Sequence, residues 1–128
     1  MGWYSAAHGY NGFLRWAYDS WPEDPLRDAR YGSWAAGDSY LVYPGGNSCI
    51  RFEKLREGIV DYEKIRILRE LAAKSSDASV KKLITELDAH LKTLNDEKTF
   101  NEAKLKNDIS KGREILDELS ERLSVRKL

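Results

Sequence analysis

The stretch that sets the class of the fold is Glu53-Lys-Leu-Arg-Glu-Gly-Ile-Val-Asp-Tyr-Glu-Lys-Ile-Arg-Ile-Leu-Arg-Glu-Leu-Ala72. Its apolar residues recur at steps of three and four positions, which places them on one side of an α-helix. This stripe consists of Leu55, Ile59, Tyr62, Ile65, Leu68 and Leu71-Ala72. The pattern therefore predicts an amphipathic helix that begins near residue 53.

Two further helical stripes follow this one along the chain. Ser75-Ser76-Asp77 predicts the end of the first helix and the N-cap of the second, whose stripe is Val80, Leu83-Ile84, Leu87, Leu91 and Leu94. Thr99-Phe100-Asn101-Glu102 has capping-box spacing, and it precedes the stripe Leu105, Ile109, Gly112, Leu116, Leu119 and Leu123. Short links between three amphipathic helices predict antiparallel packing, with the last two helices forming a hairpin.

The composition changes near the turn cluster Pro44-Gly45-Gly46-Asn47. All four tryptophans and six of the seven tyrosines lie before this cluster, whereas leucine, isoleucine, lysine and glutamate dominate after it. We therefore divide the chain into an aromatic-rich strand and loop segment, residues 1–52, and a helical segment, residues 53–128. The expected fold class is mainly α with a few short β-strands.

Short extended stretches are expected within the aromatic-rich segment. The first, residues 12–18, is an apolar and aromatic run bounded by glycine before it and Asp-Ser after it, which favours a buried strand. It follows a helix end at residues 2–8, for which Gly9 is a natural stop. Two more extended stretches are expected at residues 39–43 and 50–52, with a long loop before them.

Composition and charge exclude several classes of function. The formal net charge is zero, so no overall field draws the chain toward nucleic acid or an anionic membrane. The apolar runs are too short to span a bilayer, and the N-terminus lacks the pattern of a signal peptide. Cys49 is the single cysteine, which excludes an internal disulfide. With only His8 and His90 beside it, the sequence predicts no structural zinc and no other cofactor.

The aromatic residues in and around the long loop are candidates for ligand binding. They are Trp16, Tyr18, Trp21, Trp34, Tyr40 and Tyr43. Sugar rings present C–H faces that stack on indole and phenol rings, while nearby carboxylates and arginines bind their hydroxyls. The competing interpretation is that the rings fill the core, because aromatic side chains dominate burial. We expect that role for Trp3 and Phe13, and both alternatives stay open for Trp21 and Trp34.

Glycoside hydrolysis usually needs two carboxylates held across the scissile bond. Among the acidic residues of the loop, Asp38 is the strongest functional candidate because it follows Gly37 and precedes an expected strand. Most of the others are expected to cap turns or face solvent. The chain contains no G-x-S-x-G nucleophile elbow, no P-loop and no G-x-G-x-x-G fingerprint.

Three strings, in order, carry a resemblance to a known family. They are Gly12-Phe-Leu-Arg-Trp-Ala-Tyr-Asp-Ser-Trp21, Gly37-Asp-Ser-Tyr-Leu-Val-Tyr-Pro-Gly45 and Ile50-Arg-Phe-Glu-Lys-Leu-Arg-Glu-Gly-Ile-Val-Asp-Tyr-Glu63. Together they resemble the C-terminal region of glycoside hydrolase family 123, also known as the DUF4091 domain. The resemblance covers roughly residues 2–74, and it implies kinship with N-acetyl-β-galactosaminidases.

The resemblance implies the last βα unit of a (β/α)8-type barrel followed by a helical tail. Residues 12–18 would be the last barrel strand and 54–73 the last helix. Active sites of such barrels lie at the C-terminal ends of the strands. That position predicts that the substrate-binding residues are Trp16, Tyr18, Trp21, Asp38 and Tyr43. The implied ligand is an N-acetylated sugar or oligosaccharide, and the implied parent is an exported bacterial enzyme.

The resemblance supplies no catalytic residue for this chain. The family is similar to enzymes in which the substrate acetamido group attacks, an aspartate orients it and an adjacent glutamate is the acid. That pair is expected on an earlier strand, and Glu23-Asp24 has the reverse order. We therefore expect a C-terminal part of a larger glycosidase, inactive alone, which dimerises or packs its N-terminal third on its helices. The alternatives are a non-catalytic carbohydrate-binding module and a helical interaction module built on residues 77–124.

Overall fold

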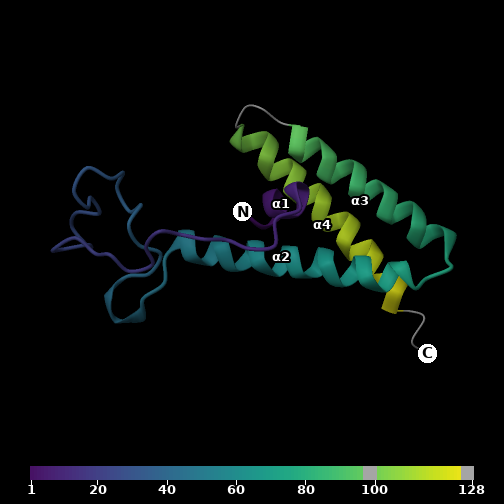
Figure 1. Ribbon diagram of the computed structural model, residues 1–128, viewed down its shortest axis with the longest axis horizontal. Coiled ribbons are helices and arrows are strands. Elements are labelled where there is room, and N and C mark those ends of the chain that lie inside the picture. The colour runs from purple at the N-terminus through teal and green to yellow at the C-terminus, as the bar shows by residue number, and fades with distance from the viewer. Residues whose placement is uncertain (97–100, 125–128) are drawn as a thin grey trace. The chain divides into compact units, whose positions relative to one another are not determined.

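The computed structural model describes residues 1–96 and 101–124, and its regular structure is almost entirely helical (Figure 1). The elements are α1 (Gly2–His8), the 3-10 helix η1 (Pro44–Gly46), α2 (Ile50–Ala73), α3 (Ala78–Asp96) and α4 (Glu102–Ser124). Within these described ranges, β-pairing is limited to two isolated antiparallel bridges, Asp19 with Tyr40 and Tyr43 with Asn47. The prediction of a mainly α chain is thus confirmed.

The chain divides into two compact units. One consists of Met1–Asn11 and Gly58–Leu128, and we call it the helical unit. The other consists of Gly12–Glu57, and we call it the aromatic unit because it contains three of the four tryptophans. Each unit is described by itself below.

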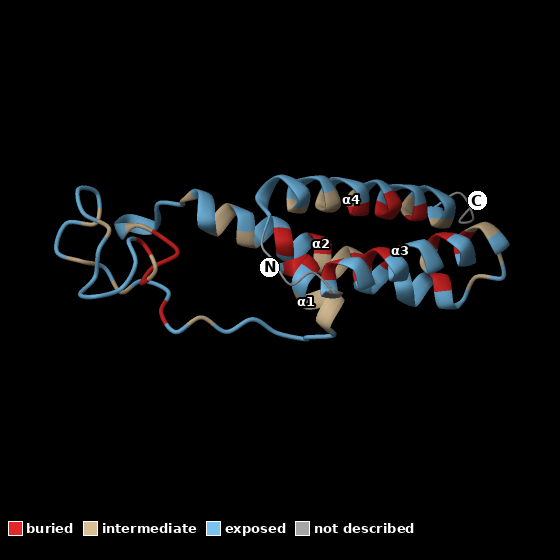
Figure 2. Ribbon diagram, turned by 90° about the horizontal axis from the view of Figure 1, so that it is seen from above, coloured by how far each residue is buried: buried red, intermediate tan, exposed pale blue. Residues whose placement is uncertain are grey.

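The helical unit is built around an antiparallel hairpin of α3 and α4, as Figures 1 and 2 show. Buried residues line the inward sides of the helices in Figure 2. This core consists of Trp3, Ile65, Leu68, Ala72, Val80, Leu83, Leu87, Leu91, Leu94, Ile115, Leu116 and Leu119. Most of these residues belong to the three stripes that the sequence predicts. The structure packs α3 against α4, and it confirms the core role of Trp3.

Side-chain caps define where the helices of the hairpin begin. Asp77 accepts a hydrogen bond from the Ser79 backbone N–H at 2.7 Å, so it is the cap expected before α3. Asn101 accepts one from the Lys104 backbone N–H at 3.0 Å before α4. Two other members of the proposed capping box, Thr99 and Phe100, lie outside the described residues. At the end of α1, Gly9 has φ 68°, a left-handed conformation that suits the predicted stop.

A buried polar network joins α1, α2 and α4. The Trp3 indole N–H donates to Asp61 at 2.8 Å, and the Arg113 guanidinium donates to both oxygens of the same carboxylate at 2.8–3.1 Å. The backbones of α1 and α2 approach closely beside it, because a Cβ on Gly2 would lie 1.7 Å from the Gly58 carbonyl oxygen. Small residues and one shared carboxylate thus fix α1 against the longer helices.

The expected strands of the aromatic unit do not form as predicted. Residues 12–18 have no strand in the structure, and Leu14 and Phe13 are 95% and 43% exposed, so the core role expected for Phe13 is wrong. An isolated strand has no partner for its backbone groups. Backbone pairing in this unit is confined to a few hydrogen bonds, such as the one that the Leu41 N–H donates to the Tyr18 carbonyl oxygen at 2.7 Å.

The extended conformation expected for residues 50–52 is also wrong, because this tripeptide forms the first turn of α2. Ile50 is 81% exposed, so burial in a sheet does not favour the extended state there. Glu53 stands in the first helical turn, where a carboxylate interacts favourably with the helix dipole. Its backbone N–H already donates to the Cys49 carbonyl at 3.0 Å. Helix α2 therefore begins three residues earlier than the stripe indicates.

Candidate functional site

Two exposed indole rings pack against each other on the aromatic unit. The ring centroids of Trp16 and Trp34 lie 5.0 Å apart with an interplanar angle of 30°, and both residues are 52% exposed. Trp34 is placed by a turn in which its backbone N–H donates to the Tyr31 carbonyl at 3.1 Å. The pair resembles an offset stack, a favourable arrangement of aromatic rings. Their remaining exposed surfaces are available to a flat apolar ligand face.

A carboxylate lies beside this indole pair. Asp38 Oδ1 accepts a hydrogen bond from Arg15 Nη2 at 2.5 Å, and the same guanidinium nitrogen also donates to the Asp38 carbonyl oxygen. The Trp16 indole N–H points at Asp38 Oδ2 with a separation of 3.4 Å. The hydrogen bond from Arg15, followed by that from Trp16, holds the pKa of Asp38 below its ordinary value. Asp38 is therefore an ionised acceptor, and Oδ2 has capacity left for another donor.

The other three predicted binding residues contact the rest of the aromatic unit. The Trp21 indole N–H donates to the Val42 carbonyl at 2.7 Å. The Tyr18 ring packs edge-on to Phe52 with centroids 6.3 Å apart, and the Tyr43 ring packs edge-on to Tyr40 at 5.2 Å. The structure thus brings Trp16 and Asp38 into direct contact, whereas Tyr18 and Trp21 hydrogen-bond to segment 39–43, of which Tyr43 is the last residue.

Arg51 fixes the centre of the aromatic unit. Its guanidinium lies 5.2 Å from the centroid of the buried Tyr40 ring, and it donates to the Tyr40 carbonyl at 3.4 Å. A Cβ on Gly37, which has φ 74°, would lie 2.1 Å from this guanidinium. The left-handed backbone and the nearby guanidinium both favour glycine in the turn that precedes Asp38.

Two residues of this cluster are not among the five predicted binding residues: Trp34, for which a binding role and a core role both stayed open, and Arg15. Trp34 lies 18 positions after Trp16 in a loop without periodicity, so no spacing rule joins them. Arg15 precedes Trp16 directly, but its partner Asp38 lies 23 positions away. The composition of the loop, with tryptophan beside arginine and aspartate, is the signal that pointed to this region.

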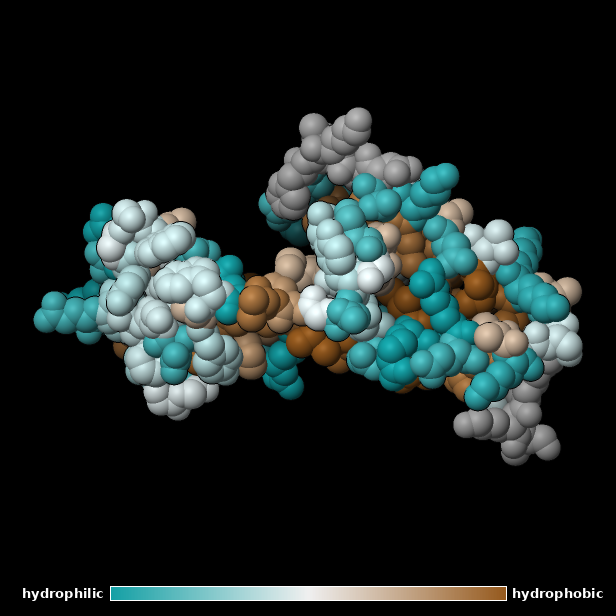
Figure 3. Space-filling model, viewed as in Figure 1, coloured by the Kyte–Doolittle hydropathy of each residue, from teal (hydrophilic) through white to brown (hydrophobic). Residues whose placement is uncertain are grey.

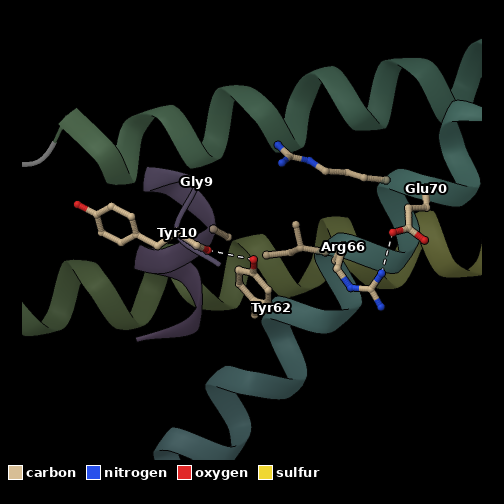
Figure 4. A pocket seen from close by; sticks show the side chains of 8 residues that line it. Gly9, Tyr10, Tyr62, Arg66 and Glu70 are labelled. Carbon is tan, nitrogen blue, oxygen red and sulfur yellow. Dashed lines mark hydrogen bonds and ion pairs between the residues drawn. The ribbon is translucent and has the colours of Figure 1, made fainter. Parts of the chain in front are cut away.

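A separate pocket lies in the helical unit (Figure 4). It has a volume of about 280 Å³ and is lined by Ala6, Gly9, Tyr10, Tyr62, Ile65, Arg66, Arg69 and Glu70. The Tyr62 hydroxyl donates to the Tyr10 carbonyl at 3.0 Å, and Arg66 pairs with Glu70 at 2.7 Å, both visible in Figure 4. The pairing is the ordinary i,i+4 kind on a helix surface. The five predicted binding residues belong to the aromatic unit, not to this pocket.

The described part of the chain offers no ready metal centre. Across residues 1–96 and 101–124, His, Cys, Asp and Glu side chains form no group of three or more with the geometry to hold a metal ion. The site is thus described by its organic groups: two indoles, one carboxylate and the arginine bound to it.

A comparison with protein families places the chain in one of them. The model of the glycoside hydrolase 123 catalytic domain matches residues 1–68, which is just over half of the chain. The chain belongs to this family. No curated protein matches the chain. The match includes Trp16, Trp34, Asp38 and Arg15, so the whole cluster lies within the glycoside hydrolase 123 catalytic domain region.

Membership in this glycoside hydrolase family indicates a carbohydrate as the class of substrate. It agrees with the expected resemblance at the level of the family. Among the helices that the structure describes, none is both long and apolar enough to cross a membrane.

Proposed function

We propose that the aromatic unit binds a sugar ring of a glycoside hydrolase substrate at Trp16 and Asp38. The observation that carries this proposal is the exposed Trp16 indole beside the ionised Asp38 carboxylate. The indole stacks on the C–H face of the sugar, while Asp38 Oδ2 accepts a hydrogen bond from a hydroxyl or amide N–H. Tyr18, Trp21 and Tyr43 extend this binding wall along segment 39–43.

The proposed ligand is an N-acetylated hexosamine such as N-acetylgalactosamine. The resemblance to N-acetyl-β-galactosaminidases motivates this choice within the carbohydrate class. A carboxylate that only accepts hydrogen bonds suits the amide N–H of the acetamido group, which only donates.

The proposed role of these residues is substrate binding, without the catalytic acid. A general acid for glycoside hydrolysis needs a raised pKa so that it carries its proton near neutral pH. The pKa of Asp38 is lowered by Arg15, and hydrogen bonds from Arg30 lower the pKa of Asp28 to about 2. Both groups are ionised where the enzyme would have to donate a proton. We infer that other residues supply the catalytic pair.

Hydrolysis and binding measured on the same sample test this function. The chain is incubated with an aryl N-acetyl-β-galactosaminide, and ligand contact is followed by saturation-transfer NMR with N-acetylgalactosamine. We expect saturation transfer to the sugar, no aryl release above the buffer rate, and loss of transfer in Trp16→Ala and Asp38→Ala. Aryl release that Asp38→Ala abolishes would overturn the non-catalytic role, and absent transfer would overturn sugar binding.

A further inference from the structure

We infer that Trp34 and Arg15 are positioning residues that preorganise the two sugar contacts, Trp34 by holding the Trp16 indole and Arg15 by holding the Asp38 carboxylate. This inference rests on the proposed function of the same site. It assigns a role to two residues whose contacts are otherwise unexplained on an exposed surface.

The argument for Trp34 starts from the exposure of Trp16. A half-exposed indole ordinarily samples several rotamers, and fixing such a side chain on binding weakens affinity. Trp34 packs against the Trp16 ring at 5.0 Å, and Asp38 lies at the indole N–H. These two contacts hold both the ring plane and its rotation. Despite this packing, Trp16 remains 52% exposed, so part of its surface stays open to the sugar.

The argument for Arg15 starts from the two oxygens of Asp38. Arg15 takes Oδ1 and also the backbone carbonyl of the same residue, so one guanidinium fixes the side chain relative to its own main chain. Oδ2, by contrast, has one hydrogen bond among the described residues, the 3.4 Å contact with Trp16. Arg15 thus holds Oδ2 beside the Trp16 indole N–H while it lowers the pKa of the Asp38 carboxyl.

The charges around Asp38 predict how the role of Arg15 affects the pH dependence of sugar affinity. Arg15 and, at longer range, Arg51 are the cations that lower the pKa of Asp38. A protonated Asp38 loses acceptor capacity, so sugar affinity falls as pH drops through its pKa. In the wild-type chain, sugar affinity is therefore lost at a pH below about 3.9, the usual pKa of an aspartate. Removal of the Arg15 charge moves the fall to higher pH.

The test for Trp34 compares three variants by titration with N-acetylgalactosamine. We expect about three- to tenfold weaker affinity in Trp34→Ala, near wild-type affinity in Trp34→Phe, and no change in the control Tyr31→Ala. Tyr31 is an exposed aromatic residue of the same loop. The circular dichroism couplet of the stacked indoles should disappear in both Trp34 variants. Equal affinity in wild type and Trp34→Ala would overturn the assignment.

The test for Arg15 uses the pH dependence of the same affinity. Arg15→Met should bind the sugar more weakly than wild type, and its affinity should fall at a higher pH as the solution is acidified. Arg15→Lys keeps the positive charge, so its affinity should fall at nearly the wild-type pH. If the affinity of Arg15→Met falls at the same low pH as that of wild type, the positioning role of Arg15 is overturned. Trp16→Ala and Asp38→Asn test the proposed sugar site separately from the positioning roles. If these two variants lose binding and the Trp34 and Arg15 variants do not, only the inference about positioning fails. If wild type does not bind, the proposed function itself fails.

Discussion

Asp61 is the residue on which the helical unit depends most clearly. Its carboxylate is 7% exposed and accepts hydrogen bonds from Trp3 on α1 and Arg113 on α4. Asp61→Ala leaves a buried indole N–H without this acceptor and deprives Arg113 of its bidentate partner. We predict a loss of about 1–3 kcal/mol in the free energy of unfolding, measured by urea denaturation.

Asp117→Ala is the matched control for this prediction. Asp117 also pairs with a cation across helices, with Lys64 at 2.5 Å, but its side chain is 66% exposed. Exposed pairs contribute about 0–1 kcal/mol, so the control should change stability little. Equal losses in the two variants would contradict the importance of the buried network.

Among the elements, α3 begins at a cap that can be tested alone. Asp77 accepts hydrogen bonds from the backbone N–H and the hydroxyl of Ser79, both at 2.7 Å. Asp77→Ala should lower the free energy of unfolding by about 0.5–2 kcal/mol, because a helix N-terminal N–H loses its acceptor. Thermal and urea denaturation measure the change. The exposed neighbour Ser76→Ala is the control, and a cap variant as stable as that control would argue against the cap.

Helices α3 and α4 were predictable because their stripes record which side is buried, whereas Ile59 and Leu71 of the α2 stripe are exposed. Leu87, Leu116 and Leu119 are fully buried at the positions where the three- and four-residue steps place them. The caps Asp77 and Asn101 are likewise local signals. Segment 12–18 was not predictable in this way, since an apolar aromatic run suits a strand only if another segment pairs with it. Phe13 and Leu14 are exposed because no such segment covers them in the structure.

The site was predictable only in part, for a related reason. Trp16 and Asp38 were assigned from residue chemistry and from their place in the resemblance, and the structure joins them. Arg15 and Trp34 contact their partners across 23 and 18 positions of an irregular loop. No periodicity encodes such contacts. Whether Tyr18, Trp21 and Tyr43 touch a sugar stays a prediction.

At the scale of the whole molecule, exposed apolar side chains on α2 bear on the association state. Buried Ile65 and Leu68 occupy one side of the helix, whereas Ile59, Val60, Ile67 and Leu71 are 40–65% exposed. Figure 3 shows apolar surface reaching the solvent on the helical unit. Exposed apolar patches of this kind favour association. We predict that the isolated chain is dimeric or larger.

Light scattering coupled to size-exclusion chromatography, over a range of loading concentrations, tests this prediction. The measured mass should exceed 14.7 kDa and rise with concentration. A mass that stays at the monomer value throughout would show that the apolar side of α2 is tolerated in water or covered within one chain.

The most direct test of the central claim is a tryptophan-fluorescence titration of the intact chain with N-acetylgalactosamine, with glucose as the control sugar. Our account predicts a saturable change that is specific to the acetamido sugar and disappears in Trp16→Ala. That result would mean that the Trp16 and Asp38 cluster is a formed sugar site. A spectrum that N-acetylgalactosamine leaves unchanged up to its solubility limit, or that both sugars change alike, would contradict it.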